Sequence, residues 1–219
     1  MDYRIFMAAP LAALAVTASG ADSLQVPKGW SAFSSWAFPQ GSTYEAGLAA
    51  DLPPGQARAL TIRPLGPRTG NDIGTIGQMV TGYAGKRVRF SAQVKATGID
   101  GWAGLVIGAG YIPLYLRPQM GADGGPPALA AAGCPQWCAV SVVTDIPADS
   151  EGVSHVALAL IGNGQVWARE FKVEVVGTDV PVSTDRFALD LGLALSAQQK
   201  SFLQSQAAHP TPPTGLDLQ

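Results

Sequence analysis

The stretch YAGKRVRFSAQVKATG, residues 83–98, contains an alternation that decides the fold class. Apolar side chains recur at every second position, and cationic or polar side chains fill the positions between them. A period of two is typical of a β-strand that buries one face. The pattern predicts a strand over residues 86–97. Its core side is formed by Val88, Phe90, Ala92, Val94 and Ala96.

Eight further segments have the same character, because each is short, bounded by turn residues and rich in alternating or β-branched side chains. They cover residues 44–49, 58–63, 73–81, 102–107, 112–117, 138–145, 154–161 and 165–176. No long amphipathic helix separates these nine segments, which favours two packed antiparallel sheets. The sequence therefore predicts an all-β chain whose residues 24–181 form an antiparallel two-sheet jelly-roll sandwich.

Residues 182–219 form a separate C-terminal segment with mixed signals. Its leucine-rich part, residues 187–196, fits either a strand or a helix, whereas Ser196 and Gln199 form a capping box that predicts a helix over residues 197–207. The sequence HPTPPTGLDLQ that follows is typical of a proline-rich tail. The leucine-rich part is a candidate contact for a protein partner.

Residues 1–21 have the order of a secretory signal peptide: Arg4, then an apolar run over residues 5–16, then small residues. Ser19 and Ala21 fit the small positions before the cut, and Ala18 and Gly20 fit equally well. The alternative is a buried or uncleaved anchoring helix. The run is shorter than the roughly 20 apolar residues of a membrane span, and no later segment is long enough. The mature chain is therefore expected in the periplasm or secreted.

Two cysteines, Cys134 and Cys138, lie in the sequence CPQWC. Their spacing is one residue longer than that of a redox C-x-x-C pair, and no further cysteine or nearby histidine completes a zinc site. In an oxidising compartment they could form a structural disulfide, provided that the turn brings their Cα atoms within about 7 Å. Two free thiols are the alternative.

The charge content argues against nucleic acid as a partner. Charged residues make up 14% of the chain and the formal net charge is -2, so no broad cationic field is available to hold phosphates.

The motif YxGKxVxFSAxVK at residues 83–95 resembles the galactose-binding-like jelly rolls of carbohydrate-binding modules. Together with HVALALIGNGQVW at residues 155–167, it also resembles a bacterial domain found alone in exported proteins and appended to some arabinose-operon-type transcription regulators. The resemblance covers about residues 27–181 and implies a sugar-binding sandwich. Relatives carry acidic residues near WAREF, where some sugar-binding jelly rolls hold calcium. This chain has Ala168, Arg169 and only one acid, Glu170, there, so no metal is expected, and no other cofactor is predicted.

The polar side of the strand at residues 86–97 admits two interpretations. Exposed cations commonly protect a sheet from edge-to-edge aggregation. Alternatively, these side chains belong to an aromatic-flanked surface for a glycan or another small polar or acidic ligand. The residues that would form this surface are Gln78, Arg87, Arg89, Gln93, Tyr115, Arg117 and Trp137.

Catalytic signatures are missing from the sequence, which has neither G-x-S-x-G nor H-E-x-x-H. The candidates for a glycosidase-like carboxylate pair are Asp72, Asp100, Asp145 and Glu170, and sequence cannot place them in space. The chain is accordingly predicted to be a non-catalytic binding or accessory module. A structural or assembly protein of the envelope is the alternative, and a weak hydrolase that uses a carboxylate pair is a third hypothesis.

Overall fold

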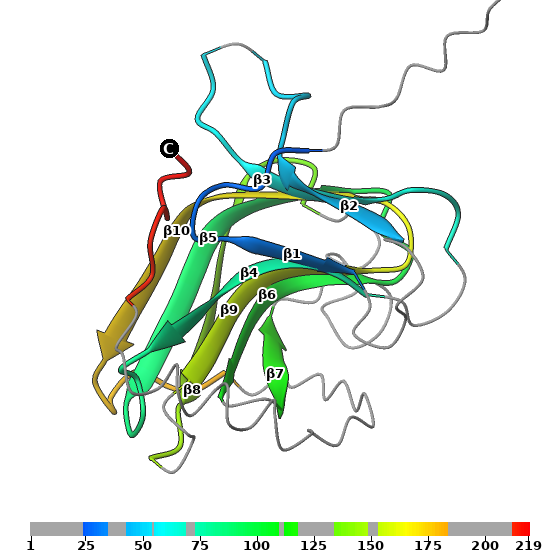
Figure 1. Cartoon of the computed structure of the whole chain (residues 1–219). Helices are drawn as coiled ribbons and strands as arrows, with labels where there is room; N and C mark the ends of the chain where they lie inside the picture. The colour runs from blue at the N-terminus through cyan, green and yellow to red at the C-terminus, as the bar shows by residue number, and fades with distance from the viewer. Residues whose placement is uncertain are drawn as a thin grey trace, which may run out of the picture.

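A computed structural model of the chain describes residues 24–34, 43–53, 55–68, 73–109, 112–117, 134–148, 153–183 and 212–219. These residues form ten β-strands in two five-stranded sheets, and every strand pair is antiparallel. The two sheets lie as layers, one over the other (Figure 1). The prediction of an all-β chain with two antiparallel sheets is confirmed.

The two sheets are called the β4 sheet and the β5 sheet. In spatial order, the β4 sheet contains β1 (Ser31–Ser34), β4 (Ile73–Thr81), β9 (Val153–Ile161), β6 (Trp102–Ala109) and β7 (Ile112–Arg117). The β5 sheet contains β2 (Tyr44–Leu48), β3 (Leu60–Pro64), β10 (Gln165–Val176), β5 (Arg87–Thr97) and β8 (Cys138–Asp145).

Strand β5 has the two faces that its alternation predicts. Val88, Phe90 and Val94 are buried between the sheets, while the side chains at the intervening positions are half-buried on the outer face. Hydrogen bonds join β5 to β10 on one side and to β8 on the other. Its charged side is therefore part of a sheet surface rather than of an open sheet edge.

All nine predicted strands are present, and four of them, β4, β7, β8 and β10, have the predicted bounds. Strand β1 is not among the nine predicted strands. Its four residues are too few to show an alternation, and they become a strand by pairing with β4, where Ser31 lies opposite Gly77. Such a pairing depends on residues distant in sequence, which local patterns do not reveal.

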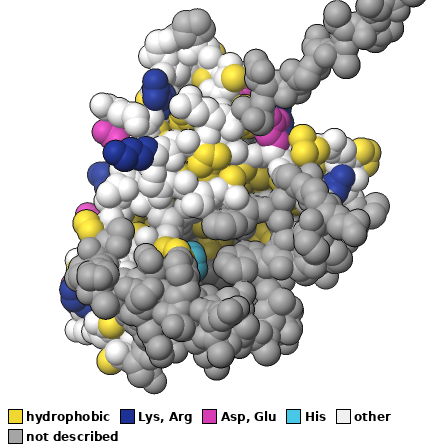
Figure 2. Space-filling view, in the orientation of Figure 1, with side chains coloured by type: hydrophobic (Ala, Val, Ile, Leu, Met, Phe, Trp, Pro, Cys, Tyr) yellow, Lys and Arg dark blue, Asp and Glu magenta, His cyan; other side chains and the backbone are white. Residues whose placement is uncertain are grey.

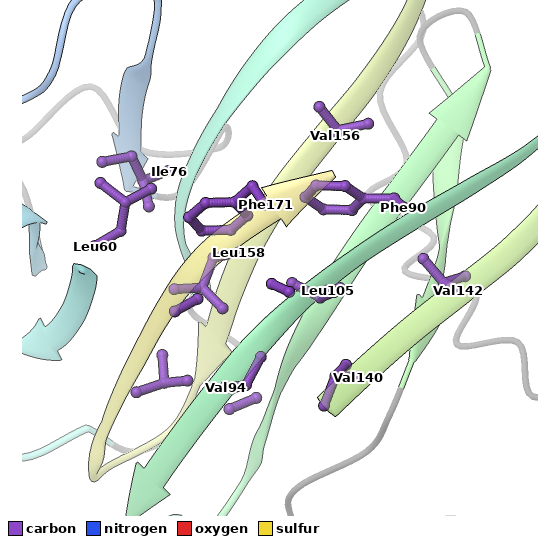
Figure 3. Packing of buried hydrophobic residues seen from close by; sticks show 14 of the residues in the cluster. Leu60, Ile76, Phe90, Val94, Leu105, Val140, Val142, Val156, Leu158 and Phe171 are labelled. Carbon is purple, nitrogen blue, oxygen red and sulfur yellow. The ribbon is translucent and has the colours of Figure 1, made fainter. Parts of the chain in front are cut away.

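The core between the sheets contains an aromatic cluster around Phe171. The ring of Phe171 lies 6.0 Å from that of Phe90, nearly parallel to it, and 4.8 Å from the ring of Trp30. Figure 3 shows Phe171 and Phe90 packed with aliphatic side chains of both sheets, including Leu158 of the β4 sheet and Val142 of the β5 sheet. Burying one large apolar side chain contributes about 1.5–3 kcal/mol, so this cluster holds the two layers together.

Several sequence predictions lie outside the described residues: the signal peptide at residues 1–21, the ambiguous residues 187–196 and the helix at residues 197–207. The described part of the chain contains no helix, and hence no helix that is long and apolar enough to cross a membrane. Residues 212–219 are described and pack against the sandwich. Leu218 is buried in the core, although it follows residue 181, where the sequence places the end of the sandwich.

Candidate functional site

The outer face of the β5 sheet carries an open groove of about 550 Å³ over strands β10, β5 and β8. Because the three strands are paired in register, the outward side chains of β5 lie in rows with those of its neighbours. One row is Glu174, Arg89 and Val143; the next is Lys172, Ser91 and Ser141; the third is Arg169, Gln93 and Ala139. All of these except Arg169 line the groove.

Strand β10 has a bulge at the centre of this groove. Lys172 pairs with Ser91 and Arg169 pairs with Gln93, so that the two residues between them, Glu170 and Phe171, oppose the single residue Ala92. Glu170 has a φ of 57°, a conformation that is unfavourable for a side chain other than glycine. The bulge turns Phe171 into the core and leaves Glu170 exposed in the groove. Bulges are over-represented next to binding and active sites.

One wall of the groove is the segment that follows β10, with Val180, Pro181 and Ser183. Ser183 is hydrogen-bonded to Val143 of β8 twice, by its amide to the Val143 carbonyl oxygen (2.8 Å) and by its Oγ, which accepts from the Val143 amide (2.9 Å). Arg87 holds the beginning of the same segment, because its Nη1 donates to the carbonyl oxygens of Thr178 and Val180, each at 2.8 Å. The wall is thus attached at both ends.

An ion pair with Asp145 orients the guanidinium of Arg87. The Arg87 Nε and Nη2 atoms donate to the two carboxylate oxygens of Asp145 at 2.7 and 2.8 Å. This hydrogen bonding lowers the pKa of Asp145 and raises the pKa of Arg87. With its donors used in this way, Arg87 supports the wall instead of facing the groove.

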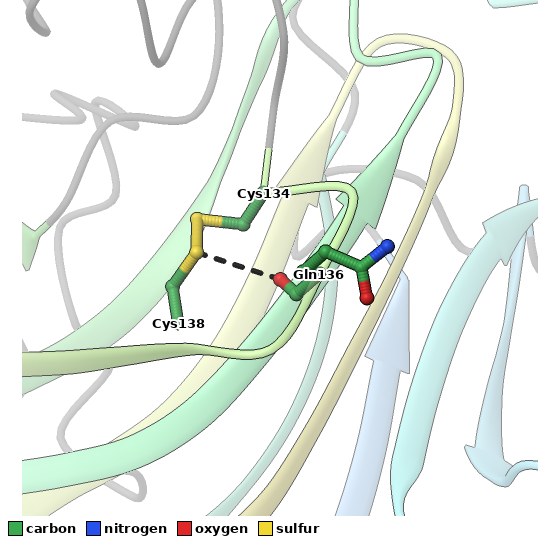
Figure 4. Close-up of a disulfide and its surroundings, with 3 residues drawn as sticks. All are labelled: Cys134, Gln136 and Cys138. Atoms are coloured by element: carbon green, nitrogen blue, oxygen red, sulfur yellow. Dashed lines mark hydrogen bonds between the residues drawn. A yellow bond between two sulfur atoms is a disulfide. The ribbon is translucent and has the colours of Figure 1, made fainter.

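Trp137 and the disulfide at the base of its loop are outside the groove lining, and Trp137 is connected to the third row through Arg169. The guanidinium of Arg169 lies 4.0 Å from the centre of the Trp137 ring, an arrangement typical of a cation–π contact. In the structure a disulfide joins Cys134 to Cys138, with 6.1 Å between their Cα atoms (Figure 4). The Cys134 carbonyl oxygen also accepts a hydrogen bond from the Ala96 amide of β5. The short loop that carries Trp137 is therefore tied at its base.

The residues predicted to form one ligand surface separate into two groups. Arg89 and Gln93 lie in the groove, Arg87 supports its wall, and Trp137 contacts Arg169 next to Gln93. Gln78 on β4 is buried in the opposite sheet, and β7, the strand of Tyr115 and Arg117, belongs to that sheet as well. The side chains of Tyr115 and Arg117 lie outside the described residues. The structure does not bring these three residues to the β5 face.

The sequence analysis did not predict the groove residues that come from β8, from β10 and from the segment after β10. The contributions of β10 and β8, with Lys172, Glu174 and Ser141, depend on strand register, and the wall depends on the path of the chain after β10. The alternation of polar residues in KVEVV, residues 172–176, was the available signal for an exposed face of β10.

Of the candidate carboxylates, Glu170 lies in the groove, while Asp100 and Asp145 lie outside it and accept hydrogen bonds. Asp100 accepts hydrogen bonds from the backbone and side-chain nitrogens of Asn163, which lower its pKa, and Arg87 lowers that of Asp145. A general acid at neutral pH requires the opposite shift. Asp72 lies outside the described residues. Among those described, no cluster of three or more His, Cys, Asp or Glu side chains could hold a metal ion.

On the face that Figure 2 shows, the described lysines and arginines do not gather into one field. In the groove itself the cationic Arg89 and Lys172 are accompanied by Glu170 and Glu174. The groove is consequently polar and of mixed charge.

No protein-family model matches the chain, and no curated protein matches it. Among solved structures, a CBM4 domain shows a TM-score of 0.43 at 16% identity, over 71% of this chain and 92% of that one. The CBM22-1 xylan-binding domain of Paenibacillus barcinonensis Xyn10C has a TM-score of 0.42 at 13% identity, over 70% and 90%. The fold resembles that of β-sandwich carbohydrate-binding modules.

A third similar structure is the enzymatically active domain of bacteriophage CBA120 tailspike protein 4, with a TM-score of 0.40 at 9% identity. The match covers 68% of this chain and 20% of the chain in that structure. At such identities and TM-scores, the likeness to these three proteins concerns the arrangement of strands and does not extend to a ligand or a reaction.

Proposed function

We propose that this chain is a non-catalytic binding module whose groove on the β5 sheet takes a glycan. The observation that supports this is the row structure of the groove floor, where three neighbouring strands present hydrogen-bonding side chains in register. We also assign strands β3 to β10 to a jelly roll, because the chain changes sheet at every connection except β6 to β7.

The chemistry of the floor suits a ligand rich in hydroxyl groups. A sugar hydroxyl both donates and accepts hydrogen bonds, and the same is true of the Ser91 and Ser141 hydroxyls and of the Gln93 amide. Lys172 adds donors and Glu170 adds acceptors. Because charges of both signs line the groove, a neutral glycan fits it better than a polyanion does.

Two further parts of the proposal rest on the sequence. The signal-like residues 1–21 are the basis for export to the periplasm or outside the cell, where polysaccharides are encountered. The sequence contains neither G-x-S-x-G nor H-E-x-x-H, which is the basis for binding without catalysis.

The experiment is a glycan array followed by calorimetry on the glycans retained. The double variant Gln93→Ala with Lys172→Ala removes two groups from the groove, while Gln56→Ala with Lys86→Ala makes the same exchanges at exposed positions outside it. We expect at least ten-fold weaker binding for the groove variant, no change for the control, and similar melting temperatures for both.

Two results would contradict the proposal. Glycan affinity that is equal in wild type and in the groove variant would place the site elsewhere. Failure of the folded wild-type protein to retain any neutral or acidic glycan would remove the glycan as the ligand class.

A further inference from the structure

Residues 212–219, called here the C-terminal strap, are held against the sandwich by side chains from three separate places in the chain. We propose that these side chains form a peptide-binding groove, that the strap is its resident ligand, and that the strap of a second copy of the chain can occupy it in trans. The strap is the red segment in Figure 1. It is bound independently of the glycan groove, because no strap residue lines that groove.

Gln78 is the central recognition residue of this peptide-binding groove. Its side chain is only 5% exposed on β4, and a buried amide requires hydrogen-bond partners. Both partners come from the main chain of one strap residue: the Gln78 Nε2 donates to the Thr214 carbonyl oxygen (2.6 Å), and the Gln78 Oε1 accepts from the Thr214 amide (3.0 Å). Pairing of this kind recognises an extended backbone whatever its side chain.

Two other side chains bind strap carbonyl groups. The indole Nε1 of Trp30 donates to the Gly215 carbonyl oxygen at 3.0 Å, and the Arg58 Nη1 donates to the Leu218 carbonyl oxygen at 3.1 Å. Trp30, Arg58 and Gln78 belong to different parts of the fold, namely the turn before β1, the segment before β3, and β4. Together they contact the strap main chain at three points along its length.

Side chains of the strap supply selectivity. Leu218 is 1% exposed and belongs to the main hydrophobic core, and Leu216 packs against the same core. A Cβ atom at position 215 would lie 2.9 Å from the Lys28 carbonyl oxygen, so that only glycine fits without movement of the backbone. The peptide-binding groove therefore selects a sequence with glycine three residues before a buried leucine.

The way in which the strap is bound makes it separable from the sandwich. Within the described residues the strap joins neither sheet, and its own backbone hydrogen bond runs from the Leu218 amide to the Gly215 carbonyl oxygen inside the strap. Its departure would break no strand pairing. A strap from a second copy would make the same contacts, so that only the loss of the intramolecular effective concentration opposes the exchange.

The first test uses a chain that ends at residue 211 and a fluorescently labelled peptide of residues 212–219. We expect saturable binding by fluorescence anisotropy and a melting temperature that rises with peptide concentration. A peptide with Leu218→Ala should bind at least ten-fold more weakly. As a second variant of unchanged length, the full chain with Leu218→Asp should bind the wild-type peptide in the same way.

The second test asks whether two copies exchange straps. A Gln78→Leu chain has an intact strap and a defective peptide-binding groove. A Leu218→Asp chain has a defective strap and an intact peptide-binding groove. A mixture of the two should contain a heterodimer by sedimentation velocity, in a larger amount than either chain forms alone.

The outcomes decide separate parts of the proposal. Peptide binding without a heterodimer would support the groove and overturn the exchange between copies. A folded truncated chain that ignores the peptide would overturn the groove. So would a truncated chain and a Leu218→Asp chain that both stay unfolded at saturating peptide, because the strap would then be an inseparable part of the core.

Discussion

Arg87 and Asp145 face each other across β5 and β8 and share two hydrogen bonds, from Nε to Oδ1 and from Nη2 to Oδ2. The remaining Nη1 of Arg87 reaches the Thr178 and Val180 carbonyl oxygens in the wall of the groove on the β5 sheet. Planar guanidinium groups suit such two-point pairing. The pair therefore links the sheet surface to the segment that bounds the groove.

Replacing Arg87 by Gln should raise the pKa of Asp145 towards its ordinary value of about 3.9, because the hydrogen bonds that lower it are lost. The stabilisation due to the lowered pKa is present above the unfolded-state pKa and disappears as pH falls through the folded-state value. The variant should consequently lose less stability than wild type on acidification below about pH 4. Carboxyl carbon shifts, measured by NMR against pH, report the pKa directly. Arg89→Gln is the control, and an Asp145 pKa unchanged in Arg87→Gln would contradict the assignment.

Glu170 should show opposite effects on stability and on binding. Glu170→Gly relieves the positive φ and should stabilise the fold by up to about 1 kcal/mol. Glu170→Ala retains a Cβ atom and should change stability by no more than about 0.5 kcal/mol. Both variants lack the carboxylate in the groove and should bind glycan more weakly. Urea unfolding and calorimetry separate the two effects. A Gly variant that is clearly less stable than the Ala variant would contradict the strain argument.

Phe171→Ala should destabilise the fold by about 3–5 kcal/mol, because the ring fills the core between Phe90 and Trp30. Phe171→Leu retains most of the volume and should lose much less. Chemical denaturation measures both changes. If the Ala variant lost less than about 1 kcal/mol, Phe171 could not be the buried centre of the aromatic cluster.

The Tyr44 hydroxyl satisfies two groups of one buried residue, since it donates to the Gly162 carbonyl oxygen and accepts from the Gly162 amide, each at 3.0 Å. Tyr44→Phe leaves both groups unpaired and should reduce the free energy of unfolding by about 1–3 kcal/mol. The ring of Tyr83 is half-buried and packs on the same core. The control Tyr83→Phe should change the free energy of unfolding by no more than about 0.5 kcal/mol. Equal effects of the two variants in thermal and urea unfolding would argue against a special role for the Tyr44 hydroxyl.

The disulfide prediction is tested by non-reducing peptide mapping of protein recovered from an oxidising compartment. We expect a peptide in which Cys134 is joined to Cys138. Replacing both by Ser should lower stability by about 2 kcal/mol, the amount expected for so short a closed loop. It should also alter the fluorescence of Trp137, which stands on that loop. Two freely alkylated thiols in the native protein would refute the pairing.

The sequence was sufficient to predict most of the strands and the core face of β5. The alternation in residues 87–97 is a local property of a strand with one buried face, and it required no knowledge of partners. The glycines at 85, 162 and 164, which lie in turns between strands, have the positive φ that glycine adopts readily. Local chemistry of this kind is legible because each residue carries its own preference.

The site, by contrast, was decided by tertiary structure. Arg87 and Arg89 are equivalent in the sequence pattern, yet Asp145 and the carbonyl groups of the wall engage one while the other lines the groove. In the sequence Gln78 is an ordinary polar strand residue, and its role comes from its hydrogen bonds with Thr214 of the strap. Register, the bulge at Glu170 and the return of the strap to the core all arise from contacts between distant segments. The free energy of such contacts depends on partners that no local pattern specifies.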